Sequence, residues 1–96
     1  MNALKPAQAG TLESNDIMIT VAPGSKGSGV VIELESNVLT QYGQAIKQAI
    51  AAVAARQNVT DVYIKAVDRG ALDCTIQART LTALSRAGII LQKEMI

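Results

Sequence analysis

The 96-residue sequence contains no histidine, tryptophan or phenylalanine, and Cys74 is its single cysteine. Without histidine, the chain cannot form a Ser-His-Asp or Cys-His catalytic pair, and it has no imidazole to move protons near neutral pH. One cysteine cannot supply the four ligands of a structural zinc site. It also excludes an internal disulfide, so nothing indicates an oxidising compartment. These absences argue against a self-sufficient enzyme and against a metal site.

Clustered charge and long apolar runs are also missing. The formal net charge is +1, and the seven basic residues after position 37 are spread out, with no aromatic platform interleaved among them for binding nucleic acid. The longest uninterrupted apolar run, residues 49–55, is far below the about 20 residues that a membrane span requires. No secretory signal is visible at the N-terminus. We therefore expect a cytoplasmic protein that binds neither nucleic acid nor membrane.

Aliphatic residues dominate what is present. Hydrophobic residues make up 49% of the chain, among them 15 alanines, ten isoleucines, eight valines and eight leucines, but only two aromatic residues. The length and this composition predict a single domain over residues 1–96 with a small aliphatic core. We expect a loose N-terminal arm over residues 1–7. Residues 89–96 are expected to form a C-terminal tail, with an edge strand as the alternative.

A β-hairpin is predicted near the N-terminus. Residues 14–16, Ser-Asn-Asp, have the composition of a turn, because their side chains hydrogen-bond to the local backbone and asparagine tolerates positive φ. Residues 17–21 alternate β-branched residues at a period of two, which is typical of a strand with one buried face. Residues 9–13 would form the first strand. This arrangement places Ser14 at or beside the tip of the hairpin.

The middle of the chain predicts a connector, a strand and a helix. Residues 22–29 are rich in glycine, but the order of a phosphate-binding loop is absent, so we interpret them as a flexible connector. Residues 30–35 alternate as a third strand with one exposed face. A helix capped by Ser36 or Asn37 then reaches about Arg56. Its expected apolar stripe consists of Val38, Leu39, Tyr42, Ile46, Ala49, Ile50 and Val53.

The C-terminal third predicts a fourth strand and a second helix. Residues 61–67 alternate as a strand, and residues 68–70 turn the chain. Residues 72–87 predict a helix that stops at Gly88, with an apolar stripe of Leu72, Ile76, Ala83, Leu84 and Ala87. Alternation over residues 72–78 also fits a hairpin before a shorter helix. The order β-β-β-α-β-α predicts an α+β two-layer sandwich, in which two helices cover one face of a mostly antiparallel four-stranded sheet.

Ser14 is the main candidate functional residue. Serine is common in turns, so the simplest interpretation is structural. The functional interpretation is that a modifying enzyme can reach a hydroxyl at an exposed tip without unfolding the domain. Because no histidine is available as its base, Ser14 would be a point of attachment and not an activated nucleophile.

Other polar or reactive residues have structural interpretations at this stage. Cys74 is expected to be a small buried apolar residue. Asp68, Arg69 and Gly70, followed by Asp73, form a compact polar corner that is either a tight turn before a helix or a docking patch. The remaining acidic pairs, interpreted as solvated charge, are Glu13 with Asp16 and Glu33 with Glu35.

Three segments together resemble the citrate lyase acyl carrier protein family, that of the small gamma chain. They are Ala-Gly-Thr-Leu-Glu-Ser-Asn-Asp-Ile-Met at residues 9–18, Asp-Arg-Gly-Ala-Leu-Asp-Cys at residues 68–74, and Ala78-Arg79. The likeness extends from about residue 5 to residue 88, and the joint occurrence of the serine hairpin and the second segment is specific. A related carrier, that of malonate decarboxylase, is the alternative, but the Leu-Asp-Cys sequence favours the citrate version. An unmodified scaffold domain is a further alternative.

The resemblance implies a carrier that catalyses nothing itself. Ser14 would carry 2′-(5″-phosphoribosyl)-3′-dephospho-CoA through a phosphodiester, attached by a dedicated prosthetic-group transferase. An acetate ligase is implied as the partner for acetylation of the thiol. The alpha chain, an acyl transferase, would exchange acetyl for citryl, and the beta chain, a citryl lyase, would release oxaloacetate. The complex would thus cleave citrate to oxaloacetate and acetate in citrate fermentation, with no catalytic residue and no metal in this chain.

Overall fold

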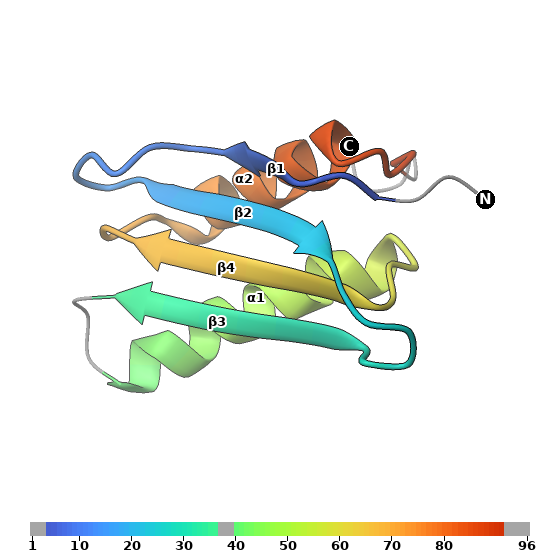
Figure 1. Cartoon of the computed structure of the whole chain (residues 1–96). Coiled ribbons are helices and arrows are strands. Elements are labelled where there is room, and N and C mark those ends of the chain that lie inside the picture. The colour runs from blue at the N-terminus through green and yellow to red at the C-terminus, as the bar shows by residue number, and fades with distance from the viewer. Residues whose placement is uncertain (1–3, 37–39, 92–96) are drawn as a thin grey trace.

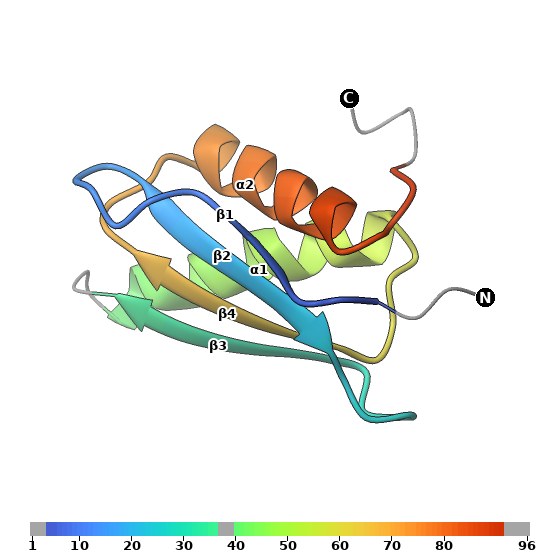
Figure 2. The ribbon, with the colours of Figure 1, turned by 45° about the horizontal axis from the view of Figure 1, so that its top comes forward.

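A computed structural model of the chain describes residues 4–36 and 40–91. Its elements, in order, are β1 (Ala7–Ala9), β2 (Ile17–Pro23), β3 (Val30–Ser36), α1 (Thr40–Arg56), β4 (Val62–Asp68) and α2 (Asp73–Arg86). The strands form one sheet, and both helices lie on the same face of it (Figure 1). The tilted view separates these two layers clearly (Figure 2). The expected α+β two-layer sandwich and its element order are confirmed.

The sheet has the strand order β1-β2-β4-β3. β2 pairs antiparallel with β1 and β4, whereas β3 and β4 pair in parallel. In Figure 1 the chain leaves β3 at the left, runs back behind the sheet through α1, and enters β4 above β3. This connection is a left-handed crossover, the uncommon hand for two parallel strands. Because β2 and β4 are the two inner strands of the sheet, they contain its most deeply buried residues.

The first strand is shorter and earlier than the sequence predicts. β1 covers Ala7–Ala9, not residues 9–13, and residues 10–16 form the loop to β2. Gly10 has a φ of +96°, and a Cβ there would overlap the carbonyl oxygen of Ile17, so only glycine fits at this position. The hairpin itself is confirmed, with Ser14 in its loop.

The helices also differ in detail from the prediction. Ser36 is the last residue of β3 and not a helix cap, and residues 37–39 lie outside the described residues. The hairpin considered for residues 72–78 is wrong, because α2 starts at Asp73 and the Ile76 amide already donates to the Leu72 carbonyl at 3.0 Å. Asn58 and Gly88, with φ of 57° and 112°, follow the two helices in the left-handed conformation, and Gly88 ends the second helix as the sequence predicts.

The core lies between the sheet and the helices. The inward residues of β2 and β4 meet one apolar stripe from each helix; fully covered examples are Ile17, Ile19, Val21, Ile50, Val62, Ile64, Ile76 and Leu84. Two predicted stripe residues do not join this core, since Tyr42 and Leu72 are 56% and 70% exposed. Tyr42 is in the first turn of α1 and Leu72 directly precedes α2, so both lie at helix ends.

Part of the expected N-terminal arm is attached to the domain. β1 begins at Ala7, and the Lys5 amide donates to the Ala87 carbonyl at 3.1 Å. At the other end, residues 89–91 form no strand, and Ile89 packs against the core. Residues 1–3 and 92–96, the rest of the expected arm and tail, lie outside the described residues. Within the described part of the chain, no helix has the length and apolar character needed to span a membrane.

Candidate functional site

Ser14 is exposed in the loop between β1 and β2, at one end of the sheet (Figure 1). The Asp16 amide donates to the Glu13 carbonyl at 3.2 Å, which closes a four-residue turn. Within this turn Asn15 has a φ of 67°, whereas Ser14 does not have positive φ. Positive φ at the third position alone is characteristic of a type II turn, where asparagine is tolerated. Ser14 therefore occupies the second position of the turn and is exposed.

Asp16 organises the loop with both of its carboxylate oxygens. Its Oδ2 accepts hydrogen bonds from the Thr11 amide at 3.1 Å and from the Thr11 hydroxyl at 2.7 Å. Its Oδ1 accepts from the Ile17 amide at 2.7 Å. Arg79 on α2 donates from Nε to Oδ1 at 3.1 Å and from Nη2 to Oδ2 at 3.0 Å. The carboxylate thus joins the two ends of the loop and links the loop to α2.

This environment contradicts the interpretation of Asp16 as solvated charge. Its side chain is only 13% exposed, although Glu13 in the same loop is exposed as expected. The Thr11 hydroxyl and, next, the Arg79 guanidinium stabilise the ionised form and lower the pKa of Asp16 from 3.8 to about 2. Asp16 is therefore a fixed negative charge at neutral pH.

The polar corner after β4 lies directly against the Ser14 loop. The Asn15 amide donates to the Arg69 carbonyl at 2.7 Å, and the Arg69 amide donates to the Asp16 carbonyl at 2.9 Å. Gly70 has a φ of +96°, and a Cβ there would lie 3.6 Å from Asn15 Oδ1. The two main segments that carry the family resemblance are thus neighbours in space, which their separation in the sequence did not predict.

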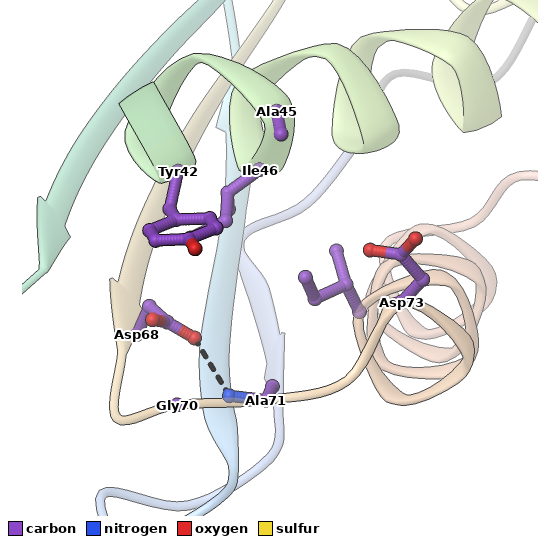
Figure 3. Close-up of a pocket in the computed structure, with 8 residues that line it drawn as sticks. Tyr42, Ala45, Ile46, Asp68, Gly70, Ala71 and Asp73 are labelled. Atoms are coloured by element: carbon purple, nitrogen blue, oxygen red, sulfur yellow. Dashed lines mark hydrogen bonds between the residues drawn. The ribbon is translucent and has the colours of Figure 1, made fainter. Parts of the chain in front are cut away.

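Asp68 holds the other side of this corner. It is 1% exposed and accepts hydrogen bonds from the Ser36 hydroxyl and the Ala71 amide, each at 3.0 Å. The bond to Ala71 is drawn in Figure 3. Asp73, by contrast, is exposed at the start of α2. Cys74 is exposed as well, so the expectation that it is a buried apolar residue is wrong.

A cavity of about 290 Å³ lies between this corner and the first turns of α1 (Figure 3). Its lining is apolar with two carboxylates and consists of Tyr42, Ala45, Ile46, Asp68, Gly70, Ala71, Asp73 and Ile76. Across residues 4–36 and 40–91, no three potential metal ligands of the His, Cys, Asp or Glu type lie together. The loop and the polar corner together present the accessible hydroxyl of Ser14 on a loop that is fixed by hydrogen bonds.

Comparison with known proteins assigns this arrangement first to a class, the acyl carriers. The family model described as "ACP: Malonate decarboxylase delta subunit (MdcD)" matches residues 4–87. A citrate lyase acyl carrier protein from Streptococcus equi subsp. zooepidemicus is 54% identical over 81 residues, covering 84% of this chain and 78% of the relative. That from Streptococcus uberis is 51% identical over 87 residues, covering 91% and 84%.

A citrate lyase acyl carrier protein from Lacticaseibacillus casei is 49% identical over 87 residues, covering 91% of this chain and 84% of the relative. The chain belongs to the family of citrate lyase acyl carrier proteins. It is the acyl carrier subunit of citrate lyase, a non-catalytic chain that carries a prosthetic group in a multi-subunit lyase. The resemblance seen in the sequence is confirmed.

Solved structures share the fold at low sequence identity. A chain of the Pseudomonas malonate decarboxylase hetero-tetramer in complex with malonate has a TM-score of 0.71 and 19% identity, covering 92% of this chain and 93% of that one. The Staphylococcus aureus RNase P protein has a TM-score of 0.54 and 11% identity, covering 85% and 83%. Two proteins with such different names share this architecture, so the fold alone does not determine function.

Proposed function

We propose that Ser14 is the residue to which the prosthetic group of this carrier is covalently attached. The observation that carries the proposal is the position of Ser14 as an exposed hydroxyl on a loop whose backbone is held by Asp16 and Arg69. None of the hydrogen bonds found in the described part of the chain involves the Ser14 side chain. A transferase can therefore reach this oxygen without breaking a contact of the domain.

The proposed group is 2′-(5″-phosphoribosyl)-3′-dephospho-CoA, joined through a phosphodiester. The site fits a large group because Ser14 is exposed in the loop at the end of the sheet, and the neighbouring Leu12 and Glu13 are exposed too. When bound, the group supplies a thiol at the end of a long flexible arm. The chain itself contributes the attachment oxygen and a rigid pivot. Cys74 lies on α2, outside the Ser14 loop, and has no role in the attachment.

Attachment requires an activated phosphate ester of the group as donor. The Ser14 Oγ forms the new bond to phosphorus, the bond from phosphorus to a phosphate or pyrophosphate leaving group breaks, and the serine proton is lost. Because the chain has no histidine, and no basic side chain among the described residues is hydrogen-bonded to Ser14, a base of the transferase takes this proton. The domain is then the substrate of the transfer and not its catalyst.

The further partners follow from the role of the carrier. We propose that it works in the cytoplasm with the alpha chain, an acyl transferase, the beta chain, a citryl lyase, and an acetate ligase. A tethered acyl group reaches each of these sites at a high effective concentration, provided that the arm can span the distance between them. The partner chains supply the catalytic groups for the cleavage of citrate to oxaloacetate and acetate.

Intact-mass measurement after co-expression with the attachment enzymes tests the proposal. We expect a single mass increase in the wild type and in the control Ser25→Ala, which removes an exposed hydroxyl from the glycine-rich loop. Ser14→Ala should show no increase, although its free energy of unfolding should change by only about 0–1 kcal/mol. In a Cys74→Ser background, thiol titration should rise from zero to one per chain on attachment. Modification of Ser14→Ala, or an unmodified wild type, would refute the assignment.

A further inference from the structure

The ion pair between Arg79 and Asp16 connects α2 to the Ser14 loop. The guanidinium binds both carboxylate oxygens, at 3.1 and 3.0 Å, in a bidentate geometry that fixes the orientation of both side chains. Arg79 is 40% exposed and Asp16 13%, so the pair lies at the surface end of the domain and not between core elements. Its main effect is therefore local to the loop.

The pair controls the two ends of the loop at once. Asp16 binds the amide and the hydroxyl of Thr11 near the beginning of the loop and the amide of Ile17 at its end. The Thr11 hydroxyl in turn accepts a hydrogen bond from the Glu13 amide at 3.2 Å. Ser14 lies between these anchored points, and its own hydroxyl contributes nothing to them. The conformation of the turn therefore depends on Asp16, and the orientation of Asp16 depends on Arg79.

We propose that Arg79 and Asp16 are positioning residues for the modification of Ser14: they hold the loop in the conformation that the attaching enzyme binds. This inference rests on the proposed attachment at Ser14. Transfer to a hydroxyl requires the oxygen in line with the reacting phosphorus, so a misplaced loop is unproductive. If the competent conformation is populated only in part, the apparent affinity of the enzyme for the carrier falls by that fraction.

Steady-state kinetics of the attachment reaction distinguish positioning from general stability. The purified transferase and its activated phosphate donor are used with the intact carrier, at a temperature where every variant is folded by circular dichroism. For Arg79→Gln, we expect KM for the carrier to rise about tenfold while kcat stays within about twofold, because at saturating carrier concentration every enzyme molecule binds a carrier whose loop is in the competent conformation. Arg79→Lys keeps the charge without the bidentate geometry and should lie in between.

Arg86→Gln is the matched control. Arg86 is also on α2 and reaches the backbone, donating to the Gln8 carbonyl at 2.9 Å, and none of the hydrogen bonds found for it in the described part of the chain is to the Ser14 loop. Its KM and kcat should equal those of the wild type. Thr11→Val removes the hydroxyl that donates to Asp16 and accepts from the Glu13 amide, and it leaves the ion pair in place, so it should raise KM by about threefold. It also serves as the second test if Arg79→Gln does not fold.

Amide hydrogen exchange gives a readout that needs no enzyme. The amides of Asn15 and Asp16, both bonded within or next to the loop, should exchange faster in Arg79→Gln than in Arg86→Gln, whereas the amide of Ile64 in the central strand should not change. If the wild type is modified at Ser14 and folded Arg79→Gln keeps the wild-type KM, positioning by this pair is refuted and the attachment site stands. An unmodified wild type would refute the attachment site itself.

Discussion

Because the pKa of Asp16 is lowered, we predict that the free energy of unfolding falls in acid and that one substitution removes this dependence on pH. The pKa falls from 3.8 to about 2 on folding, so the folded state binds a proton less readily than the unfolded state. The contribution to stability is therefore fully present above about pH 4 and is lost as the pH falls through about 2. The perturbation to test is Asp16→Asn, which keeps the size of the side chain and removes its charge.

The expected magnitude follows from this shift and from the exposure of the partner. A difference between 3.8 and about 2 corresponds to at most about 2.4 kcal/mol, at about 1.36 kcal/mol for each pKa unit. Arg79 is 40% exposed, so solvent screens part of its interaction with the carboxylate. We therefore expect Asp16→Asn to lower the free energy of unfolding by about 1–2 kcal/mol at neutral pH.

Urea unfolding followed by circular dichroism, in steps from about pH 6 to about pH 2, measures this directly. The gap between the wild type and Asp16→Asn should be constant above about pH 4 and then shrink towards zero. Glu13→Gln is the control from the same loop, and its effect should stay below about 0.5 kcal/mol because Glu13 is exposed. A gap that persists unchanged at about pH 2 would refute the linkage to this carboxylate.

Three further predictions concern stability and exposure. Gly10→Ala should lower the free energy of unfolding by at least about 2 kcal/mol, because the added Cβ would overlap a backbone carbonyl. At Gly88 an added Cβ meets nothing within 4 Å, so Gly88→Ala should cost only about 1 kcal/mol. Equal costs of the two substitutions would contradict this reasoning. In thermal unfolding, Ile64→Ala should lose about 3–4 kcal/mol and the exposed Val31→Ala under about 0.5 kcal/mol. Cys74 should react fully with a thiol reagent in native buffer, and a requirement for denaturant would show that it is buried.

The regular part of the fold follows closely from local patterns. Alternation over residues 17–21 and 61–67 predicts two strands, and the structure has them as Ile17–Pro23 and Val62–Asp68, the two inner strands of the sheet. The apolar stripe of the second helix is also correct at Ile76 and Leu84, which are 1% and 0% exposed. These signals are strong because one face of each element is fully buried, which leaves little choice of residue at every second or every third to fourth position.

The errors occur where one contact, or the position of a residue at the end of an element, outweighs the local pattern. Residues 9–13 resemble a strand, but Gly10 at positive φ ends the pairing, and Thr11 turns towards Asp16 instead of continuing the ladder. The pairing of Asp16 with Arg79 joins residues 63 positions apart, which no periodicity reveals. Cys74 is exposed because it lies in the first turn of α2, on the side away from the core.

A carrier needs a mobile arm, yet the Ser14 loop at the base of the proposed arm is held at both of its ends. The chemistry of the attachment explains how a mobile arm and a fixed loop are compatible. Modification would convert the Ser14 hydroxyl into an ester oxygen, which can no longer donate a hydrogen bond. All of the hydrogen bonds found within the described loop run through the backbone, Thr11 and Asp16, so none would be lost. The same loop shape is then available to the attaching enzyme before the reaction and to the lyase chains after it. With the group attached at Ser14 as proposed, mobility would be confined to the arm, where it would increase the number of sites that one acyl group can reach.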